Sequence, residues 1–370
     1  MADATPPLTA DAPSAPRKGY LDWLRGVGVL VMIEGHVIDA WTLDLDRSRA
    51  AYHWIWFVGG LAGAPVFLFL AGVAMALSAG VRLRRGGSER EATSRARRRG
   101  WEIFGLAFLF RLQSLVVSGG PPRTLLKVDI LNVMGVSMLA TALLWGISRR
   151  RAWRMALLCG AGVAAAVVTP LIRASTLLSL LPDPLERYLR PATATAFTLF
   201  PWAGFVLAGA AAGLWLDGAR TERQERLVNL GLAILGPVVA LGGYAASYLP
   251  PIYAETDFWT SSPTFFFVRL GVVMALVPLA YGWNGLGGRS WLCEFGRSSL
   301  FVYWIHVEMA YGVVSAALHR RLPLEQAYLG FILLSVLLFA LVRLKNRVGE
   351  PATERVRIPA PGDLAQKAIR

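Results

Sequence analysis

The chain has 370 residues, of which 55% are hydrophobic and only 17% are charged, and its mean hydropathy is +0.48. Soluble domains carry about 25% charged residues, so this composition excludes an ordinary soluble enzyme and predicts a protein whose main solvent is lipid. The formal charge of +14 is spread over short loops between apolar runs, which argues against a nucleic-acid partner. The two cysteines lie in or beside apolar segments, so we expect neither a disulfide framework nor a metal site.

The first segment of the chain predicts a leader without regular structure. Residues 1–16 are rich in Ala, Pro, Asp and Thr, and they lack the basic start and apolar core of a cleaved signal. We therefore assign residues 1–18 to a disordered cytoplasmic leader, 19–346 to a transmembrane domain and 347–370 to a cytoplasmic tail.

Ten apolar runs follow, each close to the roughly 20 residues that cross the hydrocarbon layer as a helix. They cover residues 20–41, 55–80, 101–118, 129–148, 152–172, 195–216, 227–248, 265–283, 298–318 and 324–344. Arg111 and Asn132 interrupt the third and fourth runs, which are the weakest candidates. The expected fold is an all-α polytopic bundle of about ten transmembrane helices. It shows no internal repeat of the kind that many transporters contain.

Basic residues between the runs predict the orientation, because Lys and Arg accumulate in cytoplasmic loops. Eight arginines crowd the loop expected between the second and third runs: Arg82, Arg84, Arg85, Arg90, Arg95, Arg97, Arg98 and Arg99. Four more follow the fourth run: Arg149, Arg150, Arg151 and Arg154. In contrast, residues 250–264 carry Glu255 and Asp257 and no basic residue. This alternation places both termini in the cytoplasm.

The first apolar run carries ionisable residues, which are rare at membrane depth unless they have a function. Arg25 and His36 are eleven positions apart, so on a helix they differ by about 20° around the axis and about 16 Å along it. Asp22 precedes Arg25 by one turn, and Asp39 follows His36 at neighbour spacing. An imidazole held by a carboxylate suits acid–base chemistry. The alternative is structural, with the histidine bonding a neighbouring helix and Asp22 pairing with Arg25 at the interface.

Four stretches resemble a family of membrane acyltransferases. Residues 20–26 (YLDWLRG), continued to His36, resemble an opening helix in which ten residues separate an Arg from a His. The other stretches are residues 65–72 (PVFLFLAG), 200–204 (FPWAG) and 296–306 (GRSSLFVYWIH). Together they resemble the catalytic domain of heparan-alpha-glucosaminide N-acetyltransferase and its bacterial relatives, themselves similar to the acyltransferase-3 family.

The resemblance implies transfer of an acetyl group from cytoplasmic acetyl-CoA, a co-substrate, to an amine or hydroxyl of a glycan or similar polar acceptor. On this pattern His36 is the catalytic base or a transient acyl carrier, oriented by Asp39. Arg25, with Asp22, helps to hold the site or the donor. The Arg- and Ala-rich usage suggests the inner membrane of a bacterium, and a homodimer is compatible with the pattern.

Three further residues complete the candidate site, each with an alternative. Heparan-type enzymes carry their important histidine after helix one, where His53 lies twelve positions before Pro65, so His53 competes with His36. His306 lines the acceptor site or makes a structural hydrogen bond. Arg111 contacts the donor or pairs with Asp129 or Glu102. Arg269 has the same alternatives, a bound anion or an ion pair with a carboxylate.

The arginine-rich segment and the absence of a Gly-rich nucleotide loop indicate how CoA would bind. CoA carries several phosphate charges, so arginines at the cytoplasmic rim of the bundle would attract it. Two other classes stay open at this point. One is a transporter or channel for a small polar solute, in which the same charges relay protons. The other is an inactive relative that serves as an assembly or lipid-binding factor.

Overall fold

The computed structural model describes residues 18–119, 121–191, 197–285 and 290–349. Within these ranges the chain is helical, and its only β contact is an isolated bridge between Thr42 and Leu322. Seven of the described helices are long and apolar enough to cross a membrane. These findings confirm an all-α membrane protein, whereas the count of about ten and the orientation stay predictions. The predicted leader and most of the predicted tail lie outside the described residues.

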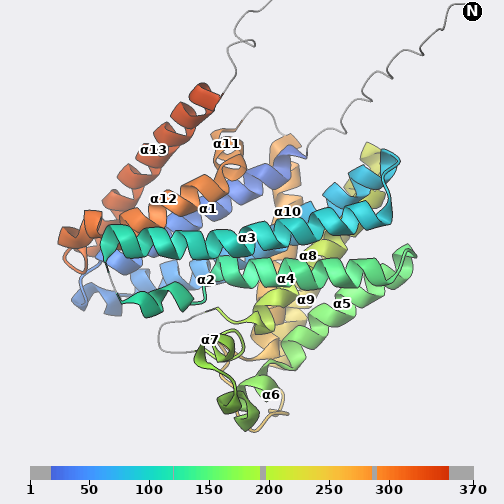
Figure 1. The fold of residues 1–370 in the computed structure, drawn as a ribbon, viewed down its shortest axis with the longest axis horizontal. Helices are drawn as coiled ribbons and strands as arrows, with labels where there is room; N and C mark the ends of the chain where they lie inside the picture. The colour runs from blue at the N-terminus through green and yellow to red at the C-terminus, as the bar shows by residue number, and fades with distance from the viewer. Residues whose placement is uncertain (1–17, 120, 192–196, 286–289, 350–370) are drawn as a thin grey trace, which may run out of the picture.

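Thirteen α-helices are present in the described ranges. They are α1 (Gly19–Trp41), α2 (Ala50–Arg84), α3 (Glu89–Ser118), α4 (Ile130–Ile147), α5 (Arg151–Val167), α6 (Thr169–Ala174), α7 (Asp183–Glu186), α8 (Leu199–Gly218), α9 (Glu222–Ala246), α10 (Pro263–Gly285), α11 (Trp291–Arg297), α12 (Ser299–Tyr311) and α13 (Leu324–Gly349). Figure 1 shows α3 and α4 side by side, and α11, α12 and α13 gathered around α1, although more than two hundred residues separate them in the chain.

Three predicted runs are absent from the seven spanning helices, each for a visible reason. The run at 20–41 is the full-length α1, but its charged residues lower its hydropathy. The run at 152–172 is divided into α5, of 17 residues, and the short α6, in which Pro170 removes a backbone donor. The run at 298–318 contains α12, of only 13 residues, followed by a 3₁₀ turn at Val313–Leu318.

The arginine-rich segment after α2 is mostly helix, which corrects the expectation of a loop there. α2 continues to Arg84 and α3 begins at Glu89, so only four residues connect them. Ser88 and Glu91 form a reciprocal capping box that satisfies the first free amides of α3. The arginines that follow therefore project from a helix and occupy defined directions.

Glycines bring the central helices into backbone contact. A Cβ atom at Gly72 of α2 would collide with the backbone of Val206 in α8, and one at Gly209 would collide with that of Phe69. Small residues at such crossings are the usual means by which transmembrane helices approach closely. Gly26 of α1 and Gly296 of α11 make a second contact of this kind. The contacts of α2 with α8 and of α1 with α11 therefore fix two walls of the site described below.

Candidate active site

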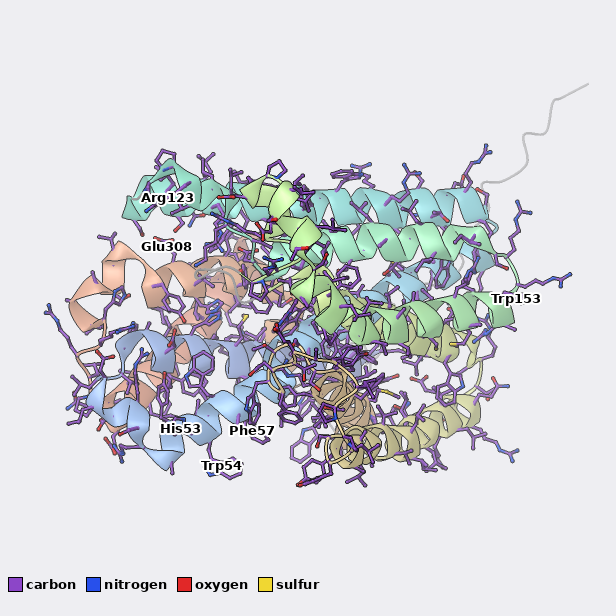
Figure 2. All side chains as sticks on the ribbon, turned by 90° about the horizontal axis from the view of Figure 1, so that it is seen from below. His53, Trp54, Phe57, Arg123, Trp153 and Glu308 are labelled. Carbon is purple, nitrogen blue, oxygen red and sulfur yellow. The ribbon has the colours of Figure 1, made fainter. Side chains whose placement is uncertain are left out.

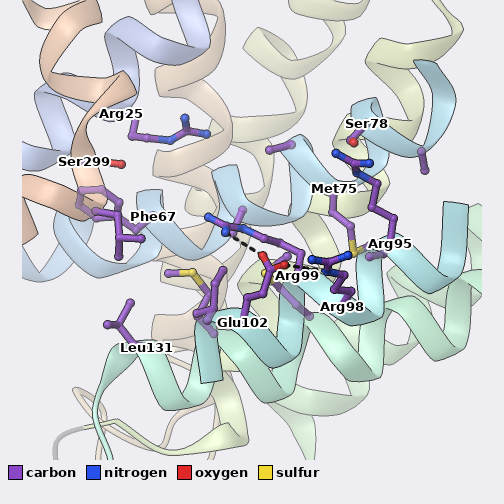
Figure 3. A pocket seen from close by; sticks show the side chains of 18 of the residues that line it. Arg25, Phe67, Met75, Ser78, Arg95, Arg98, Arg99, Glu102, Leu131 and Ser299 are labelled. Carbon is purple, nitrogen blue, oxygen red and sulfur yellow. Dashed lines mark hydrogen bonds and ion pairs between the residues drawn. The ribbon is translucent and has the colours of Figure 1, made fainter. Parts of the chain in front are cut away.

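A cavity of about 930 Å³ lies between α1, α2, α3, α4 and the α11–α12 segment (Figure 3). Six arginines line it, against two glutamates: Arg25, Arg82, Arg95, Arg98, Arg99 and Arg297, with Glu91 and Glu102. Farther along the same helices its lining becomes apolar, with Phe67, Leu131 and Met134 among the side chains. Ligand cavities of this size hold molecules as large as a cofactor. The distribution of charge suits a ligand with an anionic head and a less polar arm.

Asp22 holds two of these arginines in place. Its side chain is only 5% exposed, and its two oxygens lie 3.5 Å from Nη1 of Arg25 and 3.3 Å from Nε of Arg297. The predicted pair between Asp22 and Arg25 is confirmed, and Arg297 from the end of α11 is an addition that helical spacing did not predict. A guanidinium has five donors, so each arginine retains N–H groups for a ligand in the cavity.

A second arginine group lies on α3. Glu102 accepts hydrogen bonds from Arg98 and Arg99, each at 3.1 Å, which orients both guanidinium groups along one wall (Figure 3). Because positive charges surround a cavity with partly apolar walls, the local potential favours an anionic ligand.

The cavity ends where α3 closes against α12. Trp304 donates a hydrogen bond to Gln113, and Ser118 donates one to the carboxylate of Glu308, which is 8% exposed. The ring of Phe110 also lies 5.5 Å from that of Trp304. These contacts join the C-terminal half of α3 to the part of α12 from Trp304 onward, whereas the cavity is lined by earlier residues of both helices.

At this end the cavity stops one helical turn short of two histidines. Met32 lines the cavity four residues before His36, and Tyr303 lines it with its ring 5.8 Å from that of His306. Nδ1 of His36 lies 2.9 Å from Nε2 of His306, and the two rings are nearly coplanar, with 3° between their planes. His306 has no exposed surface, so this hydrogen bond is shielded from solvent on one side.

The hydrogen bonds of the pair specify which nitrogen carries each proton. Nδ1 of His306 lies 2.9 Å from the carbonyl oxygen of Val302, which can only accept, so Nδ1 donates. In the neutral ring Nε2 of His306 must then accept, and Nδ1 of His36 donates to it. This leaves the lone pair of Nε2 on His36 free. A neutral imidazole with a free lone pair is the form that serves as a base or a nucleophile.

The hydrogen-bond partner of His36 is therefore His306 and not Asp39, the partner expected from the sequence. Asp39 accepts a hydrogen bond from Tyr311 at 2.8 Å and pairs with Arg47 at 3.4 Å, and the described residues include no hydrogen bond between Asp39 and His36. The ring of Tyr311 lies 5.5 Å from that of His36 and is 42% exposed. Tyr311 thus stands between His36 and the molecular surface beyond the cavity.

His53 lies in a different environment from His36. It falls in the first turn of α2, where it is exposed, and its ring contacts that of Tyr52 at 6.1 Å. Figure 2 shows His53, Trp54 and Phe57 together along this end of α2. The structure thus brings His36 and His306 together, whereas His53 is exposed on α2.

The two intramembrane arginines have different surroundings. Arg111 lies outside the cavity lining and pairs with Asp129 at 2.8 Å, while Asp129 also caps α4 through the amides of Leu131 and Asn132. The structural alternative for Arg111 is therefore the arrangement present. Arg269 has no such ion pair within the described chain.

Sequence reasoning missed several residues that the structure brings to the site. Arg297 and Tyr303 lie inside the stretch 296–306 that carried the family resemblance, so a signal was present although no role was assigned. Tyr311 and Arg47 had no signal, because their relevance depends only on contacts between helices.

A family model described as "Heparan-alpha-glucosaminide N-acetyltransferase, catalytic" matches residues 17–253, which is more than half of the chain. The matched region contains α1 to α4 and therefore His36, Arg25 and most of the cavity wall. His306 and Arg297 follow it in the chain. No curated protein matches the sequence.

Proposed function

The chain belongs to the family of heparan-alpha-glucosaminide N-acetyltransferase catalytic domains, and from this membership we propose that it transfers acetyl from cytoplasmic acetyl-CoA to an acceptor across the membrane. The acceptor is an amine or hydroxyl of a glycan or similar polar molecule. Enzymes of the heparan-alpha-glucosaminide N-acetyltransferase type use acetyl-CoA as co-substrate. The observation that carries the proposal is that an arginine-lined cavity ends beside a histidine pair with one free lone pair.

The cavity fits the donor in charge and size. The phosphates of CoA would lie among the arginines that line it, with Arg25 and Arg297 held by Asp22. The pantetheine arm would then extend along the apolar lining past Met32 and bring the thioester toward His36. This placement requires the arginine end to face the cytoplasm, so we retain the topology of about ten crossings within residues 19–346, with both termini inside.

The chemistry follows from the free nitrogen of His36. Nε2 takes the proton of the acceptor hydroxyl or amine while the acceptor oxygen or nitrogen bonds to the thioester carbonyl carbon. The C–S bond then breaks, and the departing CoA sulfur receives the proton from His36. His306 keeps the imidazole in the required tautomer and stabilises its charged form through the shared hydrogen bond. The same lone pair permits a two-step route, in which Nε2 itself carries the acetyl group before the acceptor attacks.

Donor binding provides a test that does not require the acceptor. Acetyl-CoA should raise the thermal unfolding temperature of the purified full chain in detergent, with a gain of about 2.7 kcal/mol at a hundredfold excess over Kd. The variant Arg297→Ala should need more acetyl-CoA for the same shift. Absence of any shift in the wild type at saturation would contradict a CoA enzyme and favour the transporter.

Turnover provides the second test. CoA release in the presence of glucosamine as a trial acceptor, and of other amino sugars and glycans, should disappear in His36→Ala while acetyl-CoA still stabilises the variant. His53→Ala is the matched control, because it removes an exposed imidazole from the first turn of the neighbouring helix. Equal turnover by wild type and His36→Ala would refute the role of His36.

A further inference from the structure

Arg269 is a cation in the second turn of α10 without a counter-charge in the described chain. Its Cζ lies 4.1 Å from the ring centre of Phe265 and 5.4 Å from that of Trp202. Its Nε is buried without a hydrogen-bond partner, and no carboxylate of the described residues lies within ion-pair distance. The other intramembrane arginine, Arg111, has Asp129. A guanidinium inside a bundle is costly without an anion, so Arg269 calls for an anion from outside the chain.

The register between α1 and α2 gives the depth of His36. A Cβ at Gly28 would lie 3.3 Å from Cγ1 of Val66, and one at Gly63 would lie 3.9 Å from Cγ1 of Val31. The two helices therefore run antiparallel, and each step toward the end of α1 corresponds to one step toward the start of α2. Extended by about one turn, this register places His36 opposite residues from about 55 to about 60 in α2.

Arg269 lies at nearly the same depth. A Cβ at Gly60 would lie 3.7 Å from Nη2 of Arg269, so this guanidinium touches α2 within about one turn of the level of His36. At the same level a Cβ on either Gly35 or Gly59 would meet no heavy atom within 4 Å, which leaves open space beside both helices. The guanidinium and the imidazole thus lie at similar depths along α2, and both helices have open space beside a glycine at that depth.

Aromatic rings lie beside Arg269 and extend from it to α2. Phe265 contacts Trp259 with 5.0 Å between ring centres, and Trp259 contacts Phe57 of α2 at 6.3 Å. These rings offer flat apolar faces against which a sugar ring packs, while the guanidinium offers paired donors to an oxyanion. The combination is typical of a site for an acidic, ring-shaped polar molecule.

We propose that Arg269, supported by Phe265 and Trp202, binds a carboxylate or phosphate group of the acyl acceptor while the amine or hydroxyl to be acetylated lies at His36. The inference rests on the proposed function, and it names the acceptor class as an anionic sugar or a molecule of similar chemistry. Both anions match the planar fork of an arginine.

Binding of model anions tests this site without knowledge of the natural acceptor. The probes are glucuronate and glucose 6-phosphate, compared with glucose, and the readouts are tryptophan fluorescence, to which Trp202 contributes, and thermal unfolding. A non-ionic detergent without a sugar head and a buffer without phosphate avoid competition. Because hydrogen bonds to charged groups are strong, wild type should bind both anions about tenfold or more tightly than glucose.

The variants separate the site from a general effect of charge. Arg269→Gln should lose the preference for the anionic probes, and Arg269→Lys should keep part of it because the charge remains. Arg123→Gln, which removes an exposed arginine elsewhere, should bind like wild type. Equal preference in wild type and Arg269→Gln, or no preference in wild type, would overturn the inference.

Two controls keep the result specific. Acetyl-CoA should stabilise Arg269→Gln as much as wild type, which shows that the fold and the donor cavity are intact. If acetyl-CoA stabilised neither wild type nor Arg269→Gln, the proposed function would be contradicted. Binding of the sugar anions could still be measured in that case. In another outcome, phospholipid remains on purified wild type, is absent from Arg269→Gln and resists displacement by either sugar anion. That result would assign the site to a lipid headgroup and overturn the acceptor role.

Discussion

Replacement of His306 by leucine removes the acceptor that orients the proposed base. In the structure Nδ1 of His36 donates to Nε2 of His306 at 2.9 Å, and Val302 keeps His306 in the tautomer that accepts. Leucine fills similar space but has no lone pair. We expect His306→Leu to lower kcat strongly and to leave the acetyl-CoA KM near its wild-type value, because His306 does not line the donor cavity.

The expected magnitude follows from one buried hydrogen bond. A donor left without a partner in a buried site costs about 1–3 kcal/mol, which corresponds to a factor of about 5–150 in a population. That cost falls on the tautomer of His36 with its proton on Nδ1, which is the form whose Nε2 is free to act as a base. We therefore expect kcat to fall by about one to two orders of magnitude from the tautomer shift alone.

The assay is the initial rate of CoA release as a function of acetyl-CoA and acceptor concentration, with thermal unfolding to verify folding. His306→Gln is the matched variant, since its amide oxygen can reach the position of the lost ring nitrogen and accept the same proton. It should recover part of the activity that leucine removes. A folded His306→Leu with wild-type kcat would refute the reasoning, as would a folded His306→Gln no better than the leucine variant.

Three other predictions concern separate parts of the chain. His53→Ala should change turnover by no more than about twofold, as expected for a surface position, whereas His36→Ala should lose about 10²–10⁴-fold, and the reverse order in CoA-release assays would transfer the role to His53. Arg297→Ala should raise the acetyl-CoA KM about tenfold at low salt, with a smaller ratio at high salt, and a salt-independent KM would contradict phosphate binding there. Gly72→Val should destabilise the fold by about 1–3 kcal/mol in thermal unfolding because its side chain would collide with Val206, and an unchanged midpoint would contradict the close helix crossing.

Composition and apolar run length predicted the environment and the secondary structure. Long apolar runs must form helices in lipid because every backbone group has to be bonded within its own segment. The runs at 55–80 and 265–283 accordingly lie within the helices Ala50–Arg84 and Pro263–Gly285. Continuous helix cannot be assumed where proline or glycine interrupts the pattern, and there the predicted spans at 152–172 and 298–318 are divided.

Local spacing also predicted part of the site. The α-helix has a constant rotation and rise per residue, so the shared face of Arg25 and His36 and the pair between Asp22 and Arg25 followed from positions in one segment. What lies within one turn of a helix is determined by the chain itself.

The partners across helices required the tertiary structure. His36 is hydrogen-bonded to His306, 270 positions away, and the second arginine on Asp22 is Arg297, 275 positions away. Which distant helices become neighbours depends on how glycine contacts and side-chain shapes pack the whole bundle, and no spacing within one segment records that outcome. The sequence by itself therefore determined the membrane helices and the polar face of α1, whereas the packing of α12 and α3 around that face decided the cavity and the hydrogen bond between the two histidines beyond it.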